Sequence, residues 1–149
     1  EKTFVTAAVT PFFRNKEKEV TKAPQYYFWD LGLRNFLRGI YDDVADQGNR
    51  FQTFVFRLLT DHFRSSVASL HYWRTQNQAE VDFVVNLGHR VLPVEIKSAK
   101  MTKPELSRSF HSFLTKYTPP EAWIINRRLR EDVVSGKTKV RFLPWYDLL

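Results

Sequence analysis

The chain has 149 residues, of which 43% are hydrophobic and 15% aromatic, enough for one globular domain with a sizeable core. It contains no cysteine, which excludes disulfides, a thiolate nucleophile and cysteine-based zinc sites. Its formal net charge of +7 favours polyanionic partners, chiefly nucleic acid.

No apolar run approaches the roughly 18 residues of a membrane span, and no signal-peptide pattern opens the chain. Together with the absence of cysteine, this predicts a cytoplasmic protein without a membrane partner. The first residue is Glu1 rather than Met, so we expect the chain to be part of a longer protein.

The first third of the chain predicts two strands and a short helix. β-branched and aromatic residues predict strands at 3–13 and 25–30, joined by an exposed charged turn at 14–19. Leu33, Phe36 and Leu37 lie on one side of the helix, which Gly39 ends. The acidic stretch 41–48 is expected to link this part to the rest.

From Gly48 onward the pattern predicts the order helix, strand, strand, strand, helix, strand. The first helix, within 48–65, has an apolar stripe at i, i+3, i+4, i+7 and i+8. Its members are Phe51, Phe54, Val55, Leu58 and Leu59.

Three strands, a second helix and a fourth strand follow. The strands are expected at 69–75, 80–87, 91–98 and 122–126. The helix is expected at 103–117, with Thr102 as N-cap and Glu105 completing a capping box. The tail 139–149 is expected as a strand at the sheet edge, because Pro144 cannot donate a ladder hydrogen bond.

The hairpin formed by 80–87 and 91–98 carries the chemistry. Strand alternation predicts Val81, Phe83, Val85 and Leu87 on one face and Glu80 and Asp82 on the other. In the second strand Glu95 and Lys97 share the face opposite Leu92, Val94 and Ile96. A two-residue turn at Gly88 and His89 then places Asp82 opposite Glu95.

Two carboxylates about 5 Å apart repel each other, at a cost of roughly 3 kcal/mol for an effective dielectric of about 20. A divalent cation such as Mg²⁺ removes that cost, and Lys97 can hold or polarise an attacking water. A metal beside a cation is what phosphodiester hydrolysis requires. The alternative is a solvated face on which Glu80 pairs with Lys97 and Asp82 meets water.

Asp82, Glu95 and Lys97, in VDFVV and VEIKSAK, resemble the motif of the PD-(D/E)XK nuclease superfamily. The blocks YYFWDLGLRNFLRG, GNRFQTFVFRLL, HYWRTQNQAEVDFVV and LPVEIKSAK resemble the uncharacterised nuclease-like domain at the C-terminus of many prokaryotic AAA-type ATPases. This resemblance covers nearly the whole chain. It implies an α/β fold with a mixed sheet, a restriction-endonuclease-like αβββαβ core and an N-terminal β-hairpin extension.

The resemblance also implies a domain organisation and partners. Residues 1–46 would be the remnant of a winged-helix-like connector, and residues 47–149 the nuclease-like domain. ATP would bind only to an upstream ATPase module, since this chain has no GxxxxGK[ST] motif of its own. DNA and that upstream module are the expected partners.

The resemblance assigns roles to individual residues. Asp82 and Glu95 would hold Mg²⁺ or Mn²⁺ with the Ile96 carbonyl, and Lys97 would orient the water. Gln52 stands where the superfamily often has a Glu on its first core helix. Its amide can accept a hydrogen bond or ligate weakly, but it brings no charge.

Basic residues near the motif in sequence are expected to contact DNA phosphates, in a salt-sensitive and sequence-blind way. They are Arg74, Arg90, Lys100, Lys103 and Arg108, with Arg127, Arg128 and Arg130 after the fourth strand. For Lys103 and Arg108 the alternative is a solvated helix face. The four histidines have no zinc-binding spacing.

Three functions remain open on this reading. The first is a metal-dependent endonuclease-like domain serving a larger ATPase. The second is a nuclease fold without activity that binds DNA or regulates, and the third is a protein-interaction cap on the ATPase. Gln52 favours the two inactive readings, so the sequence leaves open whether the domain is an enzyme.

Overall fold

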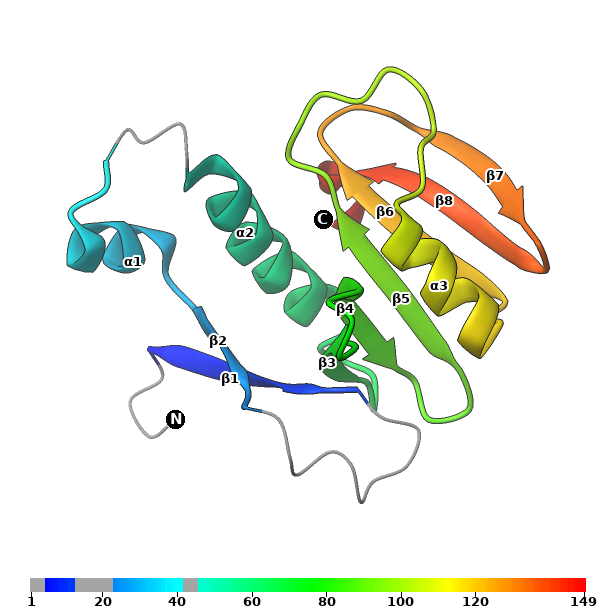
Figure 1. Cartoon of the computed structure of the whole chain (residues 1–149). Helices are drawn as coiled ribbons and strands as arrows, with labels where there is room; N and C mark the ends of the chain where they lie inside the picture. Colours follow the sequence, from blue (N-terminus) through cyan, green and yellow to red (C-terminus); the bar gives the residue numbers. More distant parts are fainter. Residues whose placement is uncertain (1–4, 13–22, 42–45) are drawn as a thin grey trace.

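A computed structural model describes residues 5–12, 23–41 and 46–149, and Figure 1 shows their arrangement. The strands of this part form one mixed sheet of eight strands, in the order β2-β1-β3-β4-β5-β6-β8-β7. The predicted α/β fold with a mixed sheet is therefore confirmed. None of the helices described is long and apolar enough to cross a membrane.

The strands are β1 Thr6–Pro11, β2 Gln25–Phe28, β3 Ser69–Arg74, β4 Glu80–Asn86, β5 Val91–Ile96, β6 Glu121–Asn126, β7 Glu131–Ser135 and β8 Thr138–Pro144. The helices are α1 Leu31–Arg38, α2 Gln47–His62 and α3 Arg108–Tyr117, with the short 3-10 helix η3 at Trp145–Leu148. The predicted order from Gly48 is confirmed as α2-β3-β4-β5-α3-β6.

The tail was predicted at the sheet edge, and this is wrong. β8 lies between β6 and β7, and β7 is the edge strand that the sequence pattern missed. Pro144 is tolerated because it is the last residue of β8, opposite Asn126, where no further ladder bond is needed.

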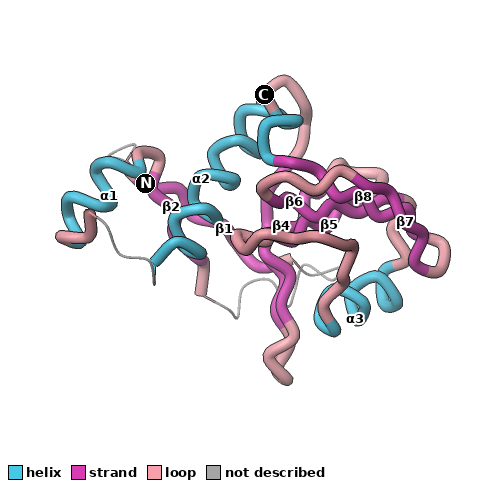
Figure 2. The backbone as a smooth tube through the Cα atoms, turned by 90° about the horizontal axis from the view of Figure 1, so that it is seen from above, coloured by secondary structure: helices cyan, strands magenta, loops and turns pink. Residues whose placement is uncertain are grey.

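Helices cover both faces of the sheet, with α2 on one side and α3 on the other (Figure 2). The prediction that the β4–β5 hairpin has one apolar and one ionisable face is therefore wrong. Phe83 and Val85 pack on the α2 side, whereas Val81 and Val84 pack in the cluster with Phe110 of α3. Strands buried on both faces are apolar on both faces, so in β4 and β5 the acidic side chains lie toward one end of each strand.

The N-terminal strands extend this same sheet. β1 pairs antiparallel with β2 and parallel with β3, as expected for the first strand pair. The predicted charged turn at 14–19, and residues 42–45 of the predicted linker, lie outside the described residues. The division at residue 46 remains a prediction.

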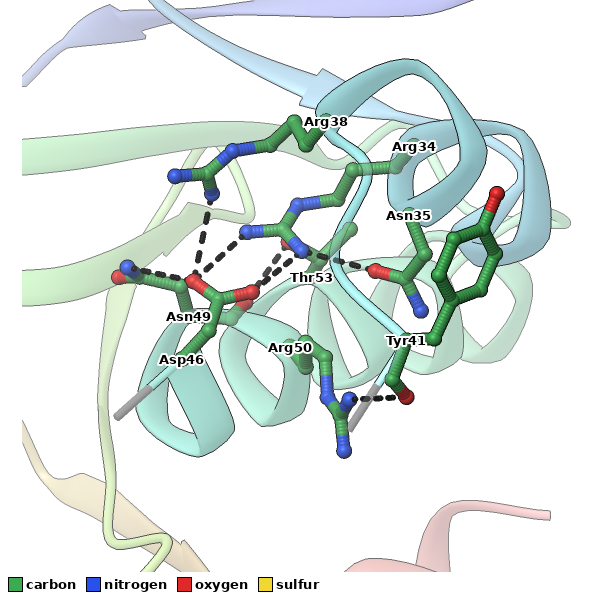
Figure 3. A network of polar contacts seen from close by, with 8 residues as sticks. All are labelled: Arg34, Asn35, Arg38, Tyr41, Asp46, Asn49, Arg50 and Thr53. Carbon is green, nitrogen blue, oxygen red and sulfur yellow. Dashed lines mark hydrogen bonds and ion pairs between the residues drawn. The ribbon is translucent and has the colours of Figure 1, made fainter. Parts of the chain in front are cut away.

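α1 forms where predicted and ends at Gly39, whose positive φ of 63° suits glycine. A polar network attaches it to the start of α2 (Figure 3). Arg34 donates two hydrogen bonds to Asp46, of 2.7 and 3.1 Å, and Arg38 adds a third of 3.2 Å. Arg34 is buried, whereas Phe36 and Leu37 are 67% and 61% exposed.

α3 begins five residues later than predicted. Its N-cap is Ser107, whose hydroxyl accepts from the Phe110 amide, so the predicted capping box of Thr102 and Glu105 is wrong. Residues 97–107 instead form a long loop between β5 and α3, which arches over one end of the sheet in Figure 1.

Candidate functional site

The β4–β5 hairpin has the predicted register. The Leu87 amide donates to the Arg90 carbonyl at 2.9 Å, and Gly88 has a φ of +82°. Asn86 pairs with Val91, and the ladder continues to Phe83 and Val94. Counted one step beyond this last pair, the same register sets Asp82 level with Glu95.

Two irregularities then set the direction of the Asp82 side chain. The β3–β4 register shifts between His71 and Trp73, so two residues of β4, Asp82 and Phe83, lie opposite one residue of β3. Such a bulge re-aims side chains, which explains why Val81 and Phe83 pack on opposite faces.

The second irregularity lies on the side of β5. The Ile96 amide donates to Asp82 Oδ2 at 2.7 Å, whereas the next amide, of Lys97, donates to Ile125 of β6. At the point where β4 and β5 separate, the Asp82 carboxylate thus accepts the hydrogen bond that a backbone carbonyl of β4 would accept in a regular sheet.

Asp82 receives its other hydrogen bond from α2. Gln52 Nε2 donates to Asp82 Oδ1 at 3.1 Å, so the structure brings Gln52 to one of the two acids of the site, where the resemblance implied a residue of the first core helix. Burial, and then the negative charges of Glu95 and Glu80, raise the pKa of Asp82 to about 7, against the opposing effects of the Ile96 amide and Lys97.

Glu95 is held from the other side of the sheet. It is 6% exposed, lies 2.5 Å from Lys97 Nζ, and accepts a 2.9 Å hydrogen bond from the Ser107 hydroxyl at the start of α3. The prediction that Asp82 and Glu95 face each other on one surface is therefore wrong in its detail. They are neighbours at the same strand ends, but their partners come from α2 and α3 respectively.

A pocket of about 340 Å³ opens beside Lys97. Lys100, Lys103 and Ser107 also line it, because the loop from 97 to 107 folds back toward α3. Lys103 lies 3.2 Å from Glu105. The pocket therefore has three ammonium groups and one exposed carboxylate along its wall.

The other predicted DNA contacts are spread more widely. Arg74 ends β3 beside Glu80, at 3.7 Å, and thus at the Asp82 end of β4. Arg108 is exposed in the first turn of α3. Arg90 lies in the hairpin turn, five residues before Glu95, which is about 17 Å along a strand. The structure does not bring Arg90 to the site.

The alternative pairing of Glu80 with Lys97 is not formed, since Lys97 pairs with Glu95. Glu80 instead accepts a 3.4 Å hydrogen bond from Gln25 of β2 and lies near Arg74. The N-terminal strands thus reach the edge of the site, which the linear motif could not indicate.

Sequence reasoning missed Ser107 and Tyr27 as supporting residues, and it grouped Arg127 only with the basic residues expected to contact phosphates. Ser107 was hidden by the stronger capping pattern upstream. Tyr27 was interpreted only as a strand residue. Arg127 connects the loop at 97–107 to α2. Its Nε donates to the Ser98 carbonyl at 2.6 Å, and its guanidinium lies over the Phe51 ring. No local signal in the sequence identifies these contacts.

The donor set fits a Mg²⁺ ion bound partly by water. Among residues 5–12, 23–41 and 46–149 no three His, Cys, Asp or Glu side chains gather as a metal cluster, but Mg²⁺ needs only one or two carboxylates when water and phosphate complete its shell. Asp82 and Glu95 supply two. Burial is the main cause of the raised pKa of Asp82, and a divalent cation bound there would favour the charged form of the carboxyl.

Comparison with known proteins places the chain among uncharacterised relatives. The profile of a domain of unknown function, DUF4143, matches residues 47–148. The chain is 36% identical over 115 residues to the uncharacterised protein Mb2031c of Mycobacterium bovis, and equally to the uncharacterised protein Rv2008c of Mycobacterium tuberculosis. These matches cover 74% of this chain but 25% of each relative, so the chain spans about a quarter of their length.

Proposed function

We propose that this chain, which belongs to the DUF4143 family, is a nuclease-like domain that binds DNA and hydrolyses phosphodiesters with a bound Mg²⁺ or Mn²⁺ as part of a larger ATPase. The observation that carries the proposal is the position of Asp82, Glu95 and Lys97 at neighbouring ends of β4 and β5, where Lys97 pairs with Glu95 and lines a pocket with further lysines. The ATPase module rests on the sequence resemblance alone.

Asp82 and Glu95 are the residues that would hold the metal. The Ile96 carbonyl is a third candidate, because a strand residue directs its N–H and C=O toward the same neighbouring strand and the Ile96 amide already faces Asp82. When bound, the ion supplies charge stabilisation and an activated water.

Lys97 forms an ion pair with Glu95 and lines the pocket. There it can orient a water or a phosphate oxygen. Lys100 and Lys103 supply further positive charge for the phosphates of a nucleic-acid strand.

A second candidate is a nuclease fold that binds DNA or regulates without cutting. Gln52 favours it, because an uncharged amide occupies the position next to Asp82 and lowers the charge available for a metal. The distinction is between binding with cleavage and binding alone.

The test is nicking of supercoiled plasmid with Mg²⁺ or Mn²⁺ by the wild type, Asp82→Ala and Asp132→Ala. We expect cleavage by the wild type, its loss by about a hundredfold or more in Asp82→Ala, and no change in Asp132→Ala. Asp132 is a matched control because it lies on β7 and pairs with Lys139. A wild type that binds DNA without cutting it supports the second candidate, and equal cleavage by Asp82→Ala contradicts the proposed site.

A further inference from the structure

A chain of hydrogen bonds runs from the N-terminal strands to Asp82. Gln25 Nε2 donates to Glu80, and the Tyr27 hydroxyl donates to Gln25 Oε1 at 3.0 Å. Gln52 Nε2 donates to the same hydroxyl at 3.1 Å and to Asp82 Oδ1 at 3.1 Å. Tyr27 lies before residue 47, where the family match begins.

The direction of these bonds determines how Gln52 is turned. A hydroxyl has one hydrogen, and that of Tyr27 is donated to Gln25. Toward Gln52 it can therefore only accept, which requires the NH₂ end of the amide. That same NH₂ group carries the second hydrogen, which is donated to Asp82.

Tyr27 is itself held rigidly. It is 8% exposed, and its ring stacks on Phe56 of α2 with centroids 4.8 Å apart and contacts Phe83 of β4 at 5.2 Å. The hydroxyl is therefore a fixed acceptor, and the rotation of the Gln52 amide follows from it.

We propose that Tyr27 is a positioning residue for the metal site, which acts through Gln52 to hold the Asp82 carboxylate in place. The proposal rests on the proposed function. It makes Gln52 a donor to a metal-binding carboxylate rather than a metal ligand, and it makes the N-terminal strands a working part of the site.

The experiment compares Mn²⁺ affinity, by calorimetry, for the wild type, Tyr27→Phe, Gln52→Ala and the double variant. Tyr27→Phe keeps the ring and removes the hydroxyl. We expect each single variant to weaken Mn²⁺ binding about tenfold, as loss of an outer-shell partner does. The double variant should be no weaker than Gln52→Ala, because Tyr27 acts only through that amide.

Tyr72→Phe is the matched control. Tyr72 is 5% exposed in the same core, but its hydroxyl donates to the Ala23 carbonyl rather than toward the site. It should leave Mn²⁺ affinity unchanged while costing similar stability. A purely structural role for Tyr27 would make the two Phe variants behave alike and the double variant additive.

A second readout needs no metal. The side-chain amide signals of Gln52 in NMR spectra, assigned by their absence in Gln52→Ala, should move in Tyr27→Phe and stay in place in Tyr72→Phe. Unchanged Gln52 signals, or wild-type Mn²⁺ affinity in Tyr27→Phe, overturn this proposal and leave the metal site standing. A wild type that binds no Mn²⁺ overturns the metal site and this proposal with it.

Discussion

At the scale of single residues, the hydrogen bond from Gln52 to Asp82 bears on whether the Asp82 carboxyl is charged. A buried carboxylate with other acids nearby favours its neutral form unless a cation or hydrogen bonds stabilise the charge. Here Ile96 and Gln52 each donate one N–H to Asp82. The neutral amide of Gln52 donates a hydrogen bond that stabilises the charged Asp82 carboxylate without a metal. A glutamate at the same position would repel that carboxylate.

Replacing Gln52 with Glu tests this balance. Without metal, Gln52→Glu is expected to lower the melting temperature, because it adds a further acid near Asp82, Glu95 and Glu80. With Mn²⁺ the variant should gain more stability than the wild type, since tighter binding of the native state adds stability. Thermal denaturation with Mn²⁺ and with EDTA measures both effects.

Gln47→Glu is the control for this substitution, because Gln47 is exposed at the start of the same helix. Its stability should not depend on Mn²⁺. A Mn²⁺ response in Gln52→Glu no larger than that of the wild type would argue against a metal next to Asp82.

At the scale of elements, α1 is attached to the molecule by charge rather than by its apolar face. Most surface helices bury their apolar stripe. α1 instead buries Arg34 against Asp46 and leaves Phe36 and Leu37 in solvent. The hydrogen bond from Arg34 lowers the pKa of Asp46 to about 2, with smaller contributions from the Asn49 hydrogen bond and the charge of Arg38.

Breaking this pair should therefore cost more than removing the apolar groups. Asp46→Asn is expected to lower the free energy of unfolding by about 3 kcal/mol, because it leaves Arg34 buried without a counter-charge. Phe36→Gln and Leu37→Gln should each change it by less than about 0.5 kcal/mol. Urea denaturation measures all three, and a reversed order would contradict the assigned roles.

The pKa of Asp46 also predicts a pH dependence. A carboxyl whose folded pKa is lowered stabilises the fold fully above its unfolded value, near 3.8, and loses this contribution as the pH falls toward 2. The wild type should lose more stability than Asp46→Asn between pH 4 and pH 2. Equal losses in urea titrations over that range would show that Asp46 does not supply this stability.

At the scale of the whole molecule, the fold gathers part of the positive charge at one end of the sheet. Lys97, Lys100 and Lys103 reach one pocket because the loop after β5 folds back. Arg90 lies at the opposite end of the β4–β5 hairpin. On the proposed function, a nucleic-acid strand at Asp82 would therefore meet the loop at 97–107 and not the hairpin turn.

Salt dependence of duplex binding, measured in EDTA, tests this arrangement. Each phosphate contact contributes about 0.9 to the slope of log affinity against log salt concentration. The variant with both Lys100→Ala and Lys103→Ala should therefore bind more weakly, with a slope reduced by about 2. Arg90→Ala should leave the slope unchanged, and an equal effect of Arg90→Ala would place DNA elsewhere.

The sequence by itself determined the order of elements from α2 to β6 and the register of the β4–β5 hairpin. It also placed Gln52 on the helix that reaches Asp82. These features depend on short-range information, namely hydrophobic periodicity and the turn at Gly88, which are complete within a few residues. The chain also belongs to a family described as a domain of unknown function, whereas the resemblance to the PD-(D/E)XK superfamily stays a prediction.

Only the tertiary structure decided which partner each acid has. The bulge at Asp82 depends on the pairing of β4 with β3. Glu95 accepts a hydrogen bond from Ser107, which is twelve residues away in the chain. Tyr27 reaches Gln52 across 25 residues because β2 lies over α2. Local periodicity carries no information about such contacts, since they form only when distant segments pack together.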